Sequence, residues 1–136
     1  MIAVLSPTVG AAEEVTVETL SLGQALYAET CASCHGAKLE GQPDWKRRLP
    51  SGRMPAPPHD ASGHTWHHTD DALFRITKDG VEAIVGGGYQ SDMPAFGDKL
   101  SDDEILAILT FIKSTWPERE RGFQAEVTRA SMEAAP

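Results

Sequence analysis

The stretch GQALYAETCASCHG, residues 23–36, decides how this chain folds. It contains both cysteines of the 136 residues, in the order Cys31-Ala-Ser-Cys34-His35. This is the spacing by which c-type haem is attached to a protein. On one helical turn the two thiols reach the two vinyl groups at one edge of a porphyrin, and the histidine that follows can ligate the iron. The motif occurs once and therefore predicts one covalent haem c, with His35 as an iron ligand.

Two other kinds of cysteine site fit the motif less well. A thioredoxin-like dithiol requires a strand followed by a helix, and no strand pattern precedes Cys31. A structural zinc site requires four ligands, and without a second cysteine pair histidines would have to complete it. Covalent haem is therefore the preferred interpretation.

A helix is predicted to lead into the cysteine motif. Ser21 begins a capping-box pattern, which predicts a helix that starts near Leu22. Gly23, Tyr27 and Cys31 follow one another at intervals of four residues and share one face of that helix.

Two further helices are marked by their ends or by one apolar face. Thr69 precedes two aspartates, which favours a helix start, and Gly80 predicts the end of that helix. Ser101-Asp-Asp-Glu104 is a complete capping box. Behind it lies an apolar stripe with helical period, made up of Ile105, Ile108, Leu109, Ile112 and Trp116.

Long loops separate these helices. Residues 36–68 contain five prolines, and residues 81–100 contain three consecutive glycines followed by Met93-Pro-Ala-Phe96. Alternating apolar runs typical of strands are scarce. The sequence therefore predicts an all-α fold of three to four helices around one covalently bound haem, with long Gly/Pro-rich loops. Loops of this length are unusual in a compact domain unless they serve a purpose, so we expect the haem to fill the space between them.

Composition and charge restrict the class of partner. With 40% hydrophobic and 24% charged residues, the chain is that of a globular protein. Its formal net charge of −8 argues against nucleic acid and against docking on an anionic membrane surface. It favours a redox protein partner with a basic docking face. No apolar run reaches the roughly twenty residues of a membrane helix, so we expect no integral membrane segment in the mature chain. We also expect the protein to be a monomer.

From Gly23 to Trp116 the chain resembles the monohaem class I cytochromes c. The matching stretches are GQALYAETCASCHG, DMPAFGDKLSDDEI and ILTFIKSTWP. The resemblance implies a cytochrome c-like fold in which the N-terminal helix crosses the C-terminal one at Gly23 and haem lies in a crevice between loops. It also implies that Tyr27 packs with Phe111.

The same resemblance implies a sixth iron ligand. Met93 lies in a loop just before the last helix of the domain, where the family places its ligating methionine. A thioether ligand favours ferrous iron and raises the reduction potential relative to two histidines. The alternative is that Met93 does not bind iron and only fills space in the packing of the protein, as most methionines do. Met54 lies among prolines without that context, and Met132 lies in the C-terminal tail.

Other groups around the haem follow from the resemblance and from chemistry. In the family a proline carbonyl in the loop after the motif accepts a hydrogen bond from the ligating histidine, and Pro55, Pro57 and Pro58 are the candidates here. Candidate donors to the haem propionates are Trp45, Arg47, Arg48, Arg53, Trp66 and Tyr89.

Four histidines lie within ten residues: His59, His64, His67 and His68. One of them could ligate the iron in place of methionine, or several could hold copper or zinc. The simpler interpretation is a polar loop in which Trp66 covers a haem edge and the histidines face water.

The chain divides into four segments on these grounds. Residues 1–12 are apolar and end in small residues, which predicts the remnant of a signal peptide and export to the periplasm or another site outside the cytoplasm. Residues 13–20 form an N-terminal extension, and residues 21–116 form the cytochrome c domain. Residues 117–136 form a polar C-terminal tail with weak helical periodicity.

The predicted function is that of an exported one-electron carrier with haem c ligated by His35 and Met93. It is not an enzyme itself, although it could be a subunit of an oxidoreductase complex. One alternative is a haem protein whose sixth position is open or labile, which binds a small ligand or serves as an enzyme subunit. Another is a copper-handling protein that uses the histidine-rich loop 59–68.

Overall fold

The structure is a computed structural model that describes residues 15–134. These residues form α1 (Val17–Thr30), α2 (Ala32–His35), the short 3-10 helix η1 (Thr65–His67), α3 (Asp70–Asp79), α4 (Val81–Val85), α5 (Asp102–Ser114) and α6 (Glu118–Ala134). No strand occurs between residues 15 and 134, and the predicted all-α class is confirmed. The helices outnumber the three to four expected, partly because α2 and α4 are single turns that no capping pattern marks. The predicted signal-peptide remnant lies outside the described residues.

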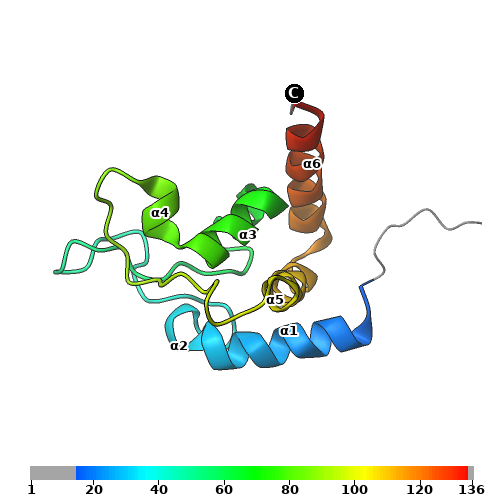
Figure 1. Ribbon diagram of the computed structural model, residues 1–136, viewed down its shortest axis with the longest axis horizontal. Coiled ribbons are helices and arrows are strands. Elements are labelled where there is room, and N and C mark those ends of the chain that lie inside the picture. Colours follow the sequence, from blue (N-terminus) through cyan, green and yellow to red (C-terminus); the bar gives the residue numbers. More distant parts are fainter. Residues whose placement is uncertain (1–14, 135–136) are drawn as a thin grey trace, which may run out of the picture.

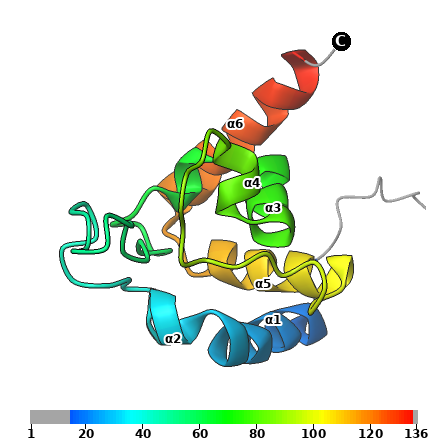
Figure 2. The same cartoon turned by 60° about the vertical axis from the view of Figure 1, so that its left-hand side comes forward.

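Helix α5 lies at the centre of the molecule, with α1 crossing it on one side and α3 packed on the other (Figures 1 and 2). It begins with the predicted capping box, in which the Ser101 hydroxyl accepts from the Glu104 N–H and the Glu104 carboxylate accepts from the Ser101 N–H. Its predicted apolar stripe is buried throughout: Ile105, Ile108, Leu109, Ile112 and Trp116. Because this stripe contacts both neighbouring helices, α5 carries the core of the domain.

Helices α1 and α5 approach one another as closely as a glycine allows. A Cβ atom at Gly23 would lie 2.0 Å from the carbonyl oxygen of Ala107 and 2.9 Å from the Cβ of Phe111. One turn further along α1, the rings of Tyr27 and Phe111 are tilted against each other with centroids 5.7 Å apart. Both contacts expected from the resemblance are confirmed, and they fix the position of the C-terminal end of α1.

Helix α1 begins earlier than the sequence predicts. Thr16 is its N-cap, and the Thr16 side chain accepts a hydrogen bond from the Thr19 N–H. Ser21 lies inside the helix and is exposed. The predicted start near Leu22 is wrong because two capping patterns occur within six residues and the chain uses the first.

Helix α3 has the predicted boundaries. The Thr69 side chain accepts from the Ala72 N–H at its start, and Gly80 ends it with a φ of 90°. Helix α4 follows directly, so the segment expected to be a loop after Gly80 opens with one helical turn. In Figure 2 this turn lies beside α3, and the chain then loops back towards α5.

Helix α6 is docked through a buried side chain. Gln124 is 1% exposed, and its amide donates to the Asp70 carboxylate, the His68 carbonyl and the Thr128 hydroxyl. Helix α6 also packs against η1 and extends away from the rest of the molecule (Figure 1). No helix between residues 15 and 134 is both long and apolar enough to cross a membrane.

Candidate functional site

The cysteine motif lies at the turn between α1 and α2. Cys31 ends α1 and begins α2, and its carbonyl accepts from the His35 N–H at 2.9 Å. Both cysteines are free thiols, Cys31 half-buried and Cys34 exposed. Burial, and secondarily the proximity of Cys34, raises the pKa of Cys31 to about 11. One short turn thus presents two thiols and an imidazole together.

The turn is tied to the core of the domain. Tyr27 is 2% exposed, and its hydroxyl donates to the carbonyl oxygen of Gly36 at 2.7 Å. This bond joins the buried face of α1 to the residue directly after the motif. Since Tyr27 also packs against α5, the position of the motif depends on the α1–α5 crossing.

His35 is held in one tautomer. Its Nδ1 atom lies 2.8 Å from the carbonyl oxygen of Pro57, so Pro57 is the member of the three candidate prolines that the structure places at the histidine. A carbonyl can only accept, so Nδ1 carries the proton and Nε2 keeps its lone pair. Burial lowers the pKa of His35 although the hydrogen bond to Pro57 opposes the shift. A lowered pKa favours the neutral ring, which is the form that binds metals.

A second imidazole lies against the first. The rings of His59 and His35 are stacked with their centroids 4.0 Å apart. The Nδ1 atom of His59 lies 2.7 Å from the Thr65 hydroxyl, and its backbone carbonyl accepts from the Trp116 indole. Burial, and then the neighbouring His35, lowers the pKa of His59 to about 3. The sequence contains no signal that separates this histidine from the other three in its loop.

The other three histidines face outward. His64, His67 and His68 are exposed, and the rings of His64 and His67 lie 5.2 Å apart. Throughout residues 15–134, no three histidine, cysteine or carboxylate side chains lie in an arrangement that could hold a metal ion. The hypothesis of a copper site in loop 59–68 is therefore not supported.

Several candidate propionate donors already have partners within the protein. Arg48 donates to the carbonyl oxygen of Gly52, and Arg53 forms an ion pair with Asp92. The Trp66 indole donates to the carbonyl oxygen of Ala61. The Trp66 ring packs against the core cluster around α5 and against Phe123 of α6, which gives this side chain a role in attaching the C-terminal helix.

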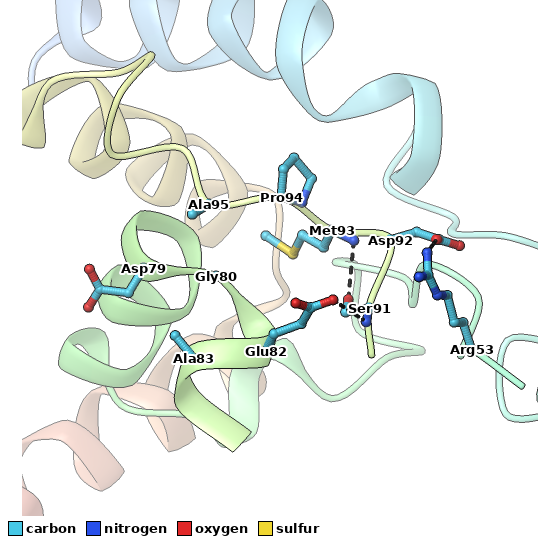
Figure 3. A pocket seen from close by; sticks show the side chains of 10 residues that line it. All are labelled: Arg53, Asp79, Gly80, Glu82, Ala83, Ser91, Asp92, Met93, Pro94 and Ala95. Carbon is cyan, nitrogen blue, oxygen red and sulfur yellow. Dashed lines mark hydrogen bonds and ion pairs between the residues drawn. The ribbon is translucent and has the colours of Figure 1, made fainter. Parts of the chain in front are cut away.

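Met93 lies in the loop between α4 and α5, in a different part of the chain from the cysteine motif. It is half-buried and lines a cavity of about 410 Å³. Figure 3 shows the Met93 thioether pointing away from Asp92 and towards Gly80 and Ala95. Its backbone N–H donates to the Ser91 hydroxyl at 3.1 Å. The role of Met93 as an iron ligand stays a prediction.

The residues present fit haem c. Two free thiols three residues apart match the covalent attachment, and His35 has one nitrogen fixed by a carbonyl and the other free for iron. Met93 adds a soft thioether donor on a loop that borders a cavity. This donor set would bind the haem through Cys31 and Cys34 and ligate its iron through His35 and Met93.

Comparisons with known proteins identify a family for this chain. The Cytochrome c family model matches residues 20–116. The cytochrome bc1 complex cytochrome c subunit of Mycobacterium leprae is 39% identical over 104 residues, which cover 63% of this chain and 35% of the relative. The subunit of the same name from Mycobacterium tuberculosis is 40% identical over 68 residues, covering 40% of this chain and 24% of the relative. The chain thus spans about a quarter to a third of the length of the curated relatives it matches.

No solved structure matches the chain. The family match nevertheless extends over most of the sequence and includes both the cysteine motif and the loop that carries Met93. With the all-α fold, the Gly23 crossing and the fixed histidine, the chain belongs to the cytochrome c family.

Proposed function

We propose that this chain is an exported electron carrier in which Cys31 and Cys34 bind one haem c, and His35 and Met93 ligate its iron. The observation that carries the proposal is the placement of His35, which is hydrogen-bonded at Nδ1 to the Pro57 carbonyl and lies directly after an exposed thiol. When bound, haem c supplies an iron that exchanges one electron between the ferric and ferrous states.

The protein around His35 keeps that ligand in place. Pro57 holds the ring at one edge, His59 covers a face of it, and the surrounding core leaves His35 only 6% exposed. A ligand that needs no rearrangement between oxidation states suits electron transfer. We infer that His35 keeps one orientation in both states.

Family membership favours electron transfer over the alternative of an open or labile sixth position. In an open site a small molecule would bind in the place of the Met93 thioether, whereas a carrier keeps both axial ligands. The Met93 loop borders the cavity from one side, and Phe96, three residues later, is buried in the domain. This anchoring supports a methionine that stays bound.

The partners we infer are redox proteins. The mycobacterial relatives are named as subunits of a cytochrome bc1 complex, which supports exchange of electrons with a complex of that type. The net charge of −8 favours a partner with a basic docking face. Weak, charge-guided docking predicts that the rate of electron exchange falls as salt is added.

Export rests on residues 1–12 and is tested by fractionation. In cells that produce the protein naturally, the haem-loaded form is expected outside the cytoplasm. Haem-loaded protein found only in the cytoplasmic fraction contradicts export.

The electron-carrier proposal is tested on protein matured with a haem-attachment system. Intact mass should show one haem per chain, and the combined Cys31→Ser and Cys34→Ser variant should show none. The purified protein should cycle between oxidised and reduced spectra, and carbon monoxide should leave the reduced spectrum unchanged. Rapid carbon monoxide binding would instead identify an open sixth position and refute the carrier.

A further inference from the structure

The loop that carries Met93 begins with three consecutive glycines. The Gly86 N–H donates to the Glu82 carbonyl and the Gly86 carbonyl accepts from the Tyr89 N–H, so Gly86 is tied by its backbone alone. Gly86, Gly87 and Gly88 have φ values of 70°, 62° and 80°. No heavy atom lies within 4 Å of the position of a Cβ at any of them. Positive φ angles favour glycine, and glycines without neighbours lose the most freedom when ordered. No side-chain packing therefore restrains the upstream end of the loop.

The downstream end of the same loop is fixed to α3. The N–H of Phe96 donates to the Thr77 carbonyl and that of Gly97 to the Lys78 carbonyl, each at 3.0 Å. The Phe96 side chain is 8% exposed. Residues 86–96 thus form an arm that lacks side-chain packing at its glycines and is anchored at Phe96, with Met93 near its anchored end.

Two side chains hold the arm between these ends. The Glu82 carboxylate accepts from the Ser91 N–H at 3.0 Å, and Arg53 forms an ion pair with Asp92 (Figure 3). Glu82 belongs to α4, which is next to the arm in sequence. Arg53 comes from the proline-rich loop and lies 39 residues before Asp92.

The Arg53–Asp92 pair is the one polar link between that loop and residues 89–94 within the described part of the chain. It occurs at the residue directly before Met93. Figure 3 shows the Asp92 and Met93 side chains on opposite sides of the backbone: Asp92 points to Arg53, and Met93 points into the cavity. The pair therefore restrains the backbone from which the thioether projects.

We propose that Arg53 is a positioning residue for Met93: its ion pair with Asp92 holds the arm closed and sets the fraction of molecules in which the thioether remains on the iron. The inference rests on the proposed role of Met93 as ligand. Arg53 and Asp92 are 37% and 55% exposed, and exposed ion pairs are weak. The pair thus shifts an equilibrium between closed and open arms without determining the fold.

Imidazole measures this equilibrium in the ferric holoprotein. It binds iron only when the thioether has left, so its apparent affinity rises in proportion to the open fraction. Arg53→Gln and Asp92→Asn should each raise the apparent affinity about twofold to fivefold, the range expected for loss of an exposed ion pair. Arg53→Lys should have an apparent affinity for imidazole close to that of the parent, because lysine keeps the positive charge that pairs with Asp92.

A charge exchange and a matched control complete the experiment. The double variant Arg53→Asp with Asp92→Arg should return the apparent affinity towards that of the parent, which a merely structural role of either residue does not predict. Arg75→Gln removes a longer and more exposed ion pair, with Asp71 at 4.0 Å in α3, and should leave the affinity unchanged. High salt should reduce the difference between the parent and Arg53→Gln.

The outcomes separate the two proposals. A parent protein without the long-wavelength band of sulfur-ligated ferric haem, or with a band that survives Met93→Ala, refutes the ligand assignment and the role of Arg53 with it. A parent with the methionine-dependent band, but with Arg53→Gln no different from Arg75→Gln, refutes the positioning role alone.

Discussion

The imidazole rings of His35 and His59 are stacked with their planes 28° apart and their centroids 4.0 Å apart. Because the Pro57 carbonyl holds Nδ1 of the same ring, His35 is restrained at one edge and on one face. Only its Nε2 atom is left for a metal. His59 therefore has a structural role in the site: its ring covers one face of the His35 ring.

Replacement of His59 by alanine should destabilise the protein and loosen His35. The variant loses a stacked pair, worth about 0.5–1.5 kcal/mol, and a hydrogen bond to Thr65, worth about 1 kcal/mol. His59→Phe keeps a flat ring and should recover the stacking part. Thermal unfolding of the three proteins checks this order. Equal stability of the alanine and phenylalanine variants contradicts it.

Replacement of Gly23 by alanine should separate α1 from α5. The new methyl group would meet the Ala107 backbone at 2.0 Å, so a helix must shift, at a cost of about 2–3 kcal/mol. Gly122→Ala in α6 is the matched control, since nothing lies within 4 Å of its Cβ position. The control should gain up to about 1 kcal/mol from helix propensity. Chemical denaturation measures the free energy of unfolding of both variants. Similar changes in Gly23→Ala and Gly122→Ala would contradict the close crossing of α1 and α5.

Replacement of Gln124 by alanine should detach α6. Three hydrogen bonds are lost and a cavity forms at a residue that is 1% exposed, at a cost of about 1–3 kcal/mol. Gln24→Ala, at an exposed position of α1, should change the free energy of unfolding very little. Hydrogen exchange of α6 amides shows whether the loss is local. Unchanged exchange in Gln124→Ala argues against docking through this side chain.

Acid should weaken the same contact through Asp70. Burial raises the pKa of Asp70, but the hydrogen bonds from Lys113 and Gln124 outweigh burial and lower it below the ordinary 3.8. A carboxyl with a lowered folded-state pKa contributes stability that is complete well above pH 3.8 and is lost as the pH falls through the folded-state value. Asp70→Asn should lack this part of the acid dependence, and Lys113→Gln should show less of it. Denaturation curves between pH 3 and 6 give the free energy of unfolding as a function of pH. The same pH dependence in the parent and in Asp70→Asn would contradict the prediction.

The parts of the fold that the sequence predicts correctly are those with local causes. Thr69 and Ser101 carry their capping hydrogen bonds, and the stripe from Ile105 to Trp116 is buried, because caps and periodicity depend on residues close in sequence. The predicted start of α1 is wrong for a local reason too. Thr16 and Ser21 can both cap a helix, and the sequence around them does not show which one is used.

The contacts that sequence reasoning misses join residues far apart. Arg53 and Asp92 are separated by 39 residues, and Gln124 and His68 by 56. Nothing in either stretch marks its partner, because each pairing depends on how whole helices and loops pack. Four histidines in one loop look equivalent in the sequence, and only the packing of Thr65 and Trp116 around His59 separates it from the others.

The absorption spectrum of ferric Met93→Ala beside the parent protein tests the central claim most directly, both proteins being matured with covalent haem. The parent should show the weak long-wavelength band of sulfur-ligated ferric haem, and the variant should lack the band while keeping one haem per chain. The variant should also have a lower reduction potential, because it loses a ligand that favours ferrous iron. A band that is absent from the parent, or present in both proteins, contradicts ligation by Met93.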